Sequence, residues 1–250
     1  MILNFRHYQN YSLPEFNDHQ VILALSSRVH KNMSLCYGDT TSSLNNRKRF
    51  LKNLGIDYRT LVCAKQIHSS QIKYVTAKDL GRGALSYKNA IKSTDALITD
   101  KKNVPLSIFT ADCLSVFLYA PKTPSIGLVH AGWRSSKENI TVKAVQLMQE
   151  KFNAKAEDLY AGFGPAIRDC CFEVEGEFTD FFEPEYLIKR DGRYYLDLAG
   201  INKKQLLAQG VKDKNIFDSK ICTSCRNEEF FSYRKEGIGC GRMISVIMLK

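Results

Sequence analysis

The chain has 250 residues, of which 44% are hydrophobic and 25% are charged, so the disordered and collagen-like classes are excluded. No apolar run approaches the length that crosses a bilayer, and the amino-terminal stretch lacks the apolar core and cleavage site of a secretory signal. We therefore expect a soluble, cytoplasmic protein whose eight cysteines are reduced thiols. The net charge of +10 is spread thinly, which argues against a nucleic-acid partner and gives modest support for an anionic ligand.

The first part of the chain is predicted to alternate short strands with one helix. Ser42 or Ser43 is expected to cap that helix, and Gly55 is expected to end it. In chain order, the predicted elements are a strand over Val21–Leu25, a helix over 44–54, strands over 60–64 and 71–75, and a loop over 78–92.

Three short apolar runs lie close together in the centre of the chain and are predicted to be buried strands, at 104–109, 114–119 and 125–129. Cys113 lies between the first two runs, and His130 ends the third. The segment that follows, Ala-Gly-Trp-Arg, leads into a helix predicted to begin at Ser135 or Ser136 and to run to Phe152. A thiol and an imidazole are therefore expected at the rim of a sheet, beside the start of a helix.

The remainder of the chain continues the mixed pattern, with strands predicted over 159–163 and 244–249 and helices predicted over 175–182 and 198–209. Several strands follow one another directly, so a purely doubly wound parallel sheet is not expected. No repeat and no linker rich in Pro, Gly or Ser interrupts the chain. The sequence therefore predicts one mixed α/β domain over 1–250.

His68, Cys113 and His130 are the leading candidate site residues, since each borders a predicted strand. Two imidazoles and a thiolate suit Zn²⁺, and three protein ligands leave a fourth position for water or substrate. Because these residues are far apart in the chain, the alternative is a buried free cysteine and two hydrogen-bonded histidines. The residues alone leave both interpretations open.

The remaining cysteines give weaker signals. The segment Cys222-Thr-Ser-Cys225 has the spacing of a zinc ligand pair, but only Cys240 follows it, so two reduced thiols are the favoured interpretation. Cys170 and Cys171 are adjacent, which places them too close to share one tetrahedral ion with ordinary geometry, so they are expected to serve packing.

Two enzyme classes find little support in the sequence. No serine lies in a nucleophile-elbow pattern, which argues against a serine hydrolase. A multicopper oxidase needs many histidines, whereas this chain has five, and His7, His19 and His30 lie outside any cluster.

Six segments together resemble one known family. They are QIHSSQI around His68, STDALIT at 93–99, TADCLSVFLY around Cys113, GLVHAGWRSS around His130, GFGPAIRDCCFEV at 162–174 and FFSYRKEGIGCGRM near the carboxyl terminus. In this order they are similar to the YfiH-type family, long labelled multicopper polyphenol oxidase or laccase domain and now regarded as purine nucleoside phosphorylases. The similarity extends from about residue 21 to the end of the chain.

The resemblance implies a layered α/β/β/α fold with mixed sheets, similar to the catalytic domain of cytotoxic necrotising factor. It also implies a catalytic zinc on His68, Cys113 and His130, and phosphorolysis of adenosine, inosine, guanosine and methylthioadenosine, with adenosine deamination in addition. Purine nucleosides and phosphate are then the partners, with Arg47 and Arg234 as the side chains chosen to hold phosphate.

The chain departs from the family pattern at Ser69, Ser115 and Ser135, which replace the usual Gly, Pro and Gly and put the shape of the pocket in doubt. Asp112 could orient a ligand or move a proton, although a structural role explains it equally well.

Two rival functions remain open. One is a metal-free cysteine hydrolase or amidase with Cys113 as nucleophile and His130 as base. The other is a non-enzymatic protein that keeps zinc for its structure.

Overall fold

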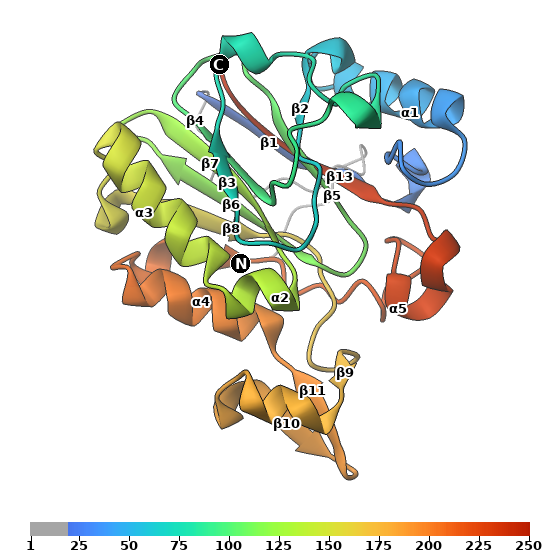
Figure 1. The fold of residues 1–250 in the computed structure, drawn as a ribbon, viewed down its shortest axis with the longest axis vertical. Coiled ribbons are helices and arrows are strands. Elements are labelled where there is room, and N and C mark those ends of the chain that lie inside the picture. Colours follow the sequence, from blue (N-terminus) through green and yellow to red (C-terminus); the bar gives the residue numbers. More distant parts are fainter. Residues whose placement is uncertain (1–19) are drawn as a thin grey trace.

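Two β-sheets lie face to face in the centre of the computed structural model, which describes residues 20–250 (Figure 1). The smaller central sheet has the order β1 (Val21–Leu25), β13 (Met243–Leu249), β5 (Leu106–Thr110), β2 (Val62–Cys63). The larger sheet has the order β12 (Ile216–Asp218), β8 (Tyr160–Phe163), β6 (Leu114–Ala120), β7 (Ser125–Ala131), β4 (Ala96–Thr99), β3 (Ile72–Tyr74). Each sheet contains parallel and antiparallel pairs.

The space between the two sheets is filled by alternate side chains of their strands. Phe117 of β6 and Leu128 of β7 meet Leu106, Ile108 and other side chains of the smaller sheet in one buried cluster. The intervening residues of β6 and β7 point the opposite way, toward the helices. These two strands are therefore buried on both faces, which explains why they read as continuous apolar runs in the sequence.

Helices cover the outer face of each sheet. Helix α1 (Thr40–Lys52) packs Phe50 and Leu51 on the smaller sheet, and α3 (Ile140–Phe152) packs Val145 and Met148 on the larger one. Helix α4 (Leu198–Ala208) joins α3 on that same face. The layers are therefore helix, sheet, sheet, helix, which confirms the predicted layered α/β/β/α fold.

Two helix predictions differ from the structure. The cap of α1 is Asp39, whose carboxylate accepts a hydrogen bond from Ser42 N–H at 2.6 Å, so the helix begins earlier than predicted. The helix predicted after His130 is two helices, α2 (Trp133–Lys137) and α3. Asn139 separates them in a left-handed conformation (φ 59°), which asparagine tolerates better than most residues.

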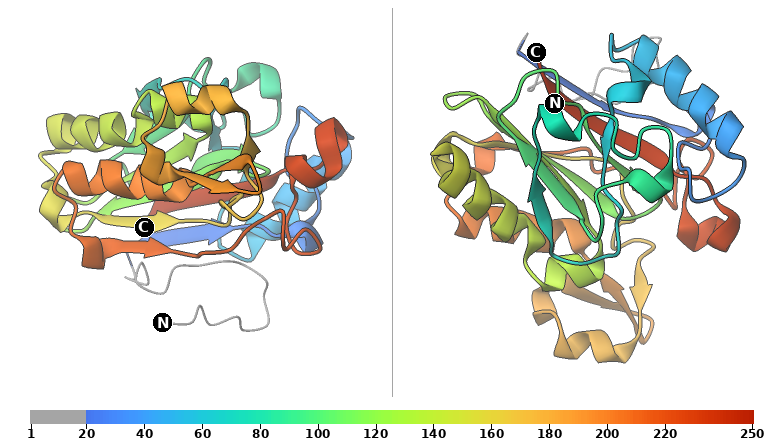
Figure 2. Two further views of the ribbon diagram at one scale, coloured as in Figure 1. Left: turned by 90° about the horizontal axis from the view of Figure 1, so that it is seen from below. Right: turned by 45° about the horizontal axis from the view of Figure 1, so that its top comes forward.

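A small antiparallel sheet lies at one end of the molecule and was not predicted as strands. It consists of β10 (Leu187–Arg190), β11 (Arg193–Leu196) and β9 (Glu173–Val174), and it projects at the bottom of Figure 1 and of the right-hand view in Figure 2. The last short helix, α5 (Tyr233–Glu236), lies at the side of the molecule, where the chain leads into β13. Within residues 20–250, no helix has the length and apolar character needed to cross a membrane.

Candidate active site

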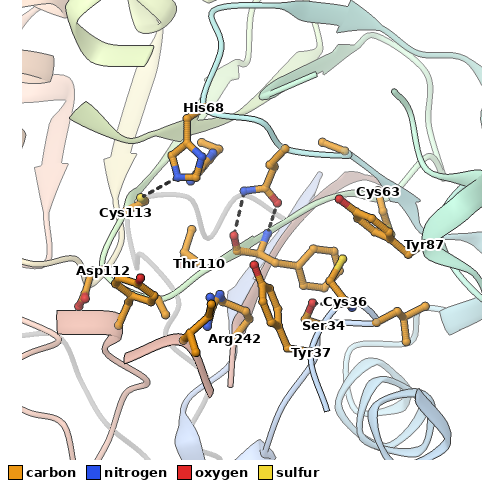
Figure 3. Close-up of a pocket in the computed structure, with 18 of the residues that line it drawn as sticks. Ser34, Cys36, Tyr37, Cys63, His68, Tyr87, Thr110, Asp112, Cys113 and Arg242 are labelled. Atoms are coloured by element: carbon orange, nitrogen blue, oxygen red, sulfur yellow. Dashed lines mark hydrogen bonds between the residues drawn. The ribbon is translucent and has the colours of Figure 1, made fainter. Parts of the chain in front are cut away.

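The structure brings His68, Cys113 and His130 together, as the sequence predicted. His68 lies in the segment between β2 and β3, Cys113 lies in the turn between β5 and β6, and His130 lies near the end of β7. Their potential ligand atoms lie within 4.8 Å of one another, and Cys113 Sγ is 3.8 Å from His68 Nε2. Figure 3 shows His68 and Cys113 pointing toward one another at the cavity wall.

A single buried carboxylate, that of Asp95, supports two members of this group. It accepts hydrogen bonds from the backbone N–H groups of His68 at 2.9 Å and Ser69 at 2.8 Å, which hold the segment that carries His68. The same carboxylate lies 2.8 Å from His130 Nδ1. Sequence analysis missed Asp95, although a lone acid directly before the buried strand β4 was a visible signal.

Backbone conformation also shapes the site. His68 and Asp112 both have positive φ angles, 60° and 88°, which are uncommon for residues other than glycine. A Cβ atom at Gly132 would lie 3.0 Å from His68 Cδ2 and 3.3 Å from Cys113 Sγ. The chain needs glycine there because the turn after β7 passes directly against both side chains.

Charge interactions within the group oppose the effect of burial. Burial alone would raise the pKa of Cys113, but the charge of His130 and hydrogen bonds to both histidines lower it to about 6. Burial would likewise lower the pKa of His130, but the Cys113 thiolate and the hydrogen bond to Asp95 raise it to about 9. Burial also opposes ionisation of Asp95, yet its bonds to His130 and Ser69 hold its pKa below the ordinary value. The pair therefore favours a thiolate and an imidazolium at neutral pH when no metal is bound.

The three side chains fit the requirements of a metal ion. Asp95 engages His130 Nδ1, so Nε2 is the nitrogen left for coordination, and a carboxylate behind a ligand histidine is the usual arrangement at metal sites. A tetrahedral ion with sulfur at about 2.3 Å and nitrogen at about 2.1 Å would separate those two atoms by about 3.6 Å. The observed distance from Cys113 Sγ to His68 Nε2, 3.8 Å, is close to this value.

The group opens on a cavity of about 690 Å³, within the range of small-molecule sites. Among residues 20–250, Asp112 is the one carboxylate that lines it, whereas four arginines do: Arg47, Arg134, Arg234 and Arg242. Aromatic rings complete the wall, among them Tyr37, Tyr87, Phe109, Trp133 and Phe172. The cavity is therefore positively charged and partly apolar.

The two arginines chosen from the sequence both line this cavity but differ in their surroundings. Arg47 is 1% exposed, and it donates hydrogen bonds to the carbonyl groups of Met33, Gly83 and Ala84 at 2.7–3.1 Å. Arg234 is exposed, and its side chain donates to the Glu173 carbonyl at 2.8 Å. Arg47 is thus held by the backbone, while Arg234 has more freedom to meet a ligand.

Asp112 has a structural partner for each oxygen of its carboxylate. Oδ1 accepts a hydrogen bond from the Thr223 hydroxyl at 2.6 Å, and Oδ2 accepts one from the backbone N–H of Arg234 at 2.7 Å. The Asp112 carbonyl in addition accepts from Ile167 N–H at 2.8 Å. These contacts fix the turn that presents Cys113, so they support the structural interpretation of Asp112.

The serines that depart from the family pattern hydrogen-bond away from the cavity. Ser69 donates to Asp95, Ser115 pairs with Ser245 between the two sheets, and Ser135 bridges Gly132 N–H and the His130 carbonyl. None of the three lines the cavity formed by the described residues. His30 lies away from the site against Ser27 and Phe50, and His7 and His19 lie outside the described residues.

Known proteins similar to this chain share most of its length. The chain is 36% identical over 225 residues to purine nucleoside phosphorylase YlmD of Geobacillus stearothermophilus, covering 86% of this chain and 82% of that one. It is 33% identical over 255 residues to a purine nucleoside phosphorylase of Clostridium acetobutylicum, covering 99% and 100% of the two chains. It is also 29% identical over 220 residues to adenosine deaminase RL5 of an unknown prokaryotic organism, covering 85% and 84%.

Solved structures also resemble this chain over most of its length. The crystal structure of YlmD from Geobacillus stearothermophilus superposes with a TM-score of 0.91 at 32% identity and covers both chains completely. The structure of Bacillus licheniformis YfiH superposes with a TM-score of 0.87 at 31% identity, covering 92% of this chain and 93% of that one. The family model described as multi-copper polyphenol oxidoreductase laccase matches residues 26–250. The chain therefore belongs to this laccase-like family, whose curated relatives include the YlmD purine nucleoside phosphorylases.

Proposed function

We propose that this chain is a zinc-dependent purine nucleoside phosphorylase that accepts adenosine, inosine, guanosine and methylthioadenosine and also deaminates adenosine. The observation that carries the proposal is the meeting of His68, Cys113 and His130 at the wall of a cavity rich in arginine and aromatic side chains. The names of the relatives, purine nucleoside phosphorylase and adenosine deaminase, support both reaction classes.

Zinc suits this ligand set because it accepts imidazole nitrogen and thiolate sulfur in a four-coordinate shell. Three protein ligands leave one position open toward the cavity, as catalytic zinc sites require. When bound, the ion would supply Lewis-acid polarisation of an oxygen atom. A multicopper centre does not fit, because the described residues offer two imidazoles and one thiol here.

Asp95 has the central supporting role in this proposal. Its bond to His130 Nδ1 leaves Nε2 as the nitrogen that coordinates once the ion displaces its proton, and its bonds to the backbone hold His68 in a left-handed conformation. The His130 ring and the main chain of His68 are thereby positioned before any ligand arrives. Cys113 needs no strong base to lose its proton, because its pKa is about 6.

The cavity wall offers side chains suited to both substrates, the purine nucleoside and phosphate. Trp133 and Phe172 offer apolar rings against which a purine base can stack, and the arginines provide charge-assisted hydrogen bonds for phosphate. In phosphorolysis a phosphate oxygen forms a bond to the anomeric carbon, the bond from that carbon to the purine nitrogen breaks, and the purine leaves with a proton. We choose Arg234 and Arg47 to hold the phosphate, with Arg234 as the more adaptable of the two.

The test combines metal analysis with phosphate-dependent turnover of inosine and adenosine. Cys113→Ala and His68→Gln are expected to lose the zinc ion held by this group together with the turnover, while His30→Gln, an imidazole outside the site, keeps both. Activity that persists in Cys113→Ala together with its metal would place the active site elsewhere. Zinc retained without any nucleoside turnover in the wild-type protein would favour a structural role for the ion.

A second candidate function rests on the same geometry. Cys113, His130 and Asp95 form a thiolate, imidazole and carboxylate chain, which is the arrangement of a cysteine hydrolase. This alternative predicts amide hydrolysis that survives chelation, and covalent trapping of Cys113 by an electrophile. The zinc enzyme predicts the reverse, because the bound ion shields the thiolate from alkylation.

A further inference from the structure

A second group of metal-binding side chains lies outside the active site. Cys170 and Cys171 lie in the segment after β8, and Cys222 and Cys225 lie in the segment after β12. Their four Sγ atoms lie within 4.8 Å of one another, and none of the four side chains lines the cavity beside Cys113. The expectation that the adjacent pair serves packing is wrong for Cys170, which is exposed.

The separations of the sulfur atoms match those of ligands around one ion. Cys225 Sγ lies 3.3 Å from Cys171 Sγ and 3.5 Å from Cys170 Sγ. Four sulfurs at about 2.3 Å from a tetrahedral ion lie about 3.8 Å apart, whereas a disulfide bond is about 2.05 Å long. All four thiols are free in the structure. Their arrangement is therefore close to a tetrathiolate shell and far from two disulfides.

A tight turn explains how two adjacent cysteines point to the same place. The N–H groups of Cys171 and Phe172 both donate to the Arg168 carbonyl, at 2.9 and 2.8 Å, so the chain doubles back at this pair. Successive side chains in a strand would diverge, but the turn brings both sulfurs toward Cys225.

The second cysteine pair is brought to this turn by the larger sheet. Strand β12 runs parallel to β8, and the pairing continues beyond both strands as a bridge between Ala166 and Cys222. Thr223 N–H donates to the Ala166 carbonyl at 3.1 Å, and Arg168 forms an ion pair with Asp218. The two segments are thus held side by side without any ion, so the thiol group is arranged in advance.

We propose that Cys170, Cys171, Cys222 and Cys225 form a second metal centre, a closed tetrathiolate site that holds one structural zinc ion. Sulfur is the donor in all four positions, which is typical of structural zinc and leaves no position for substrate. Binding releases the thiol protons to solvent and changes no oxidation state.

The site would also support the active centre indirectly. The hydroxyl group of Thr223, the residue after Cys222, donates a hydrogen bond to the Asp112 carboxylate. Asp112 in turn precedes the active-site Cys113. Ile167 N–H, from the other segment, donates to the Asp112 carbonyl. An ion that joins the two segments therefore stabilises Thr223 and Ile167, the two residues that hold the turn presenting Cys113. The four cysteines that bind this ion thus act as positioning residues.

The test counts metal ions in variants that remove one group at a time. The wild-type chain is expected to hold two zinc ions, one for each group. Cys113→Ala and the double variant Cys222→Ser, Cys225→Ser should each keep one ion, and the combination of all three changes should keep none. Cys36→Ser, an exposed thiol outside both groups, is the control and should keep both ions.

Two further measurements keep the proposal falsifiable if the double variant folds poorly. Cys170→Ser changes an exposed side chain, and in the Cys113→Ala background it should weaken cobalt binding and reduce the strong visible absorption that cobalt gives when bound by four thiolates, because one thiolate is lost. A strong chelator should lower the Tm of Cys113→Ala by about 5 °C or more, and the fall should be smaller for Cys113→Ala, Cys170→Ser.

Several results would overturn the proposal. One is a Cys113→Ala protein, purified under reducing conditions, that holds no metal and binds no added zinc or cobalt. Another is a pair of disulfides among the four cysteines, shown by a fall in the number of free thiols. Iron in place of zinc at these sulfurs would overturn the identity of the ion.

Discussion

The two groups of metal-binding side chains differ in their donors and in what surrounds them. His68, Cys113 and His130 mix nitrogen and sulfur, border the cavity and rest on a buried carboxylate. The four cysteines offer sulfur alone and join the segments that follow β8 and β12. An incomplete ligand set at a cavity suits chemistry, whereas a complete set outside it suits stability. This contrast makes the two groups separable by experiment.

Chelation should give the largest contrast. We expect a mild chelator to empty the three-ligand group first and to reduce nucleoside turnover about a thousandfold, since a lost Lewis acid costs several kcal/mol of transition-state stabilisation. The four-thiolate group should resist longer, so the Tm should fall only under stronger chelation. Turnover and Tm measured against chelator concentration would check this, and a simultaneous loss of both would contradict the separation.

Asp95→Asn should weaken the three-ligand group alone. The amide nitrogen that replaces Oδ2 cannot accept from the Ser69 N–H and hydroxyl groups, and the neutral amide interacts more weakly with the His130 imidazole, so metal affinity or turnover should fall about 10–100-fold. Asp100→Asn, at the other end of β4, is the matched control because that carboxylate contacts Tyr74 and Lys101. Equal effects of the two variants on zinc affinity would show that Asp95 has no special role.

The two arginines proposed to hold phosphate should differ in their contribution to stability. Arg234→Ala is expected to raise the KM for phosphate about tenfold with little change in Tm, because its guanidinium is exposed. Arg47→Ala should raise this KM too, and it should also lower the free energy of unfolding by about 3 kcal/mol, since three buried carbonyl groups lose their donor. Steady-state kinetics and thermal unfolding check both. A normal KM for phosphate in Arg234→Ala would remove it from the substrate site.

The smallest effect is expected in the pH dependence of Cys113 alkylation, measured on the metal-free protein. Cys113 has a pKa of about 6, so its thiolate predominates above pH 6 and its reaction with iodoacetamide should decline as the pH falls through 6. Cys36 is exposed as a residue, but partial burial of its thiol raises the pKa, so that thiol should react about tenfold more slowly at pH 7. Mass spectrometry of each peptide gives both rates. Equal rates would mean that His130 does not stabilise the thiolate.

The proximity of His68, Cys113 and His130 could be anticipated from the sequence because each of them borders a predicted strand. A run that forms a buried strand must stop near the sheet rim, so Cys113 and His130 were placed correctly by periodicity alone. Asp95 was not predicted as a site residue because its role depends on which segment packs beside it. Three of the four residues that donate hydrogen bonds to its carboxylate lie 26 to 28 positions earlier in the chain. Such a contact has no local signature.

The four-cysteine group could not be predicted from the spacing of its cysteines either, because its members also lie far apart in the sequence. Its two pairs are separated by about fifty residues and meet only because β12 runs parallel to β8. By contrast, the hairpin of β10 and β11 had a local signal that was overlooked. Asp191 and Gly192 both have positive φ angles, and an Asp-Gly pair between two short runs is typical of a tight hairpin turn.

The many bonds of Asp95 have a consequence for how the protein takes up its metal. Because one carboxylate secures both the backbone of His68 and the ring of His130, the ring of His130 and the main chain that carries His68 are already held in the empty protein. Ordering flexible ligands normally consumes part of the binding free energy, and here that ordering is accomplished during folding. Empty and loaded forms should therefore superpose closely around β4 and β7, and uptake of the ion should proceed without a slow conformational phase.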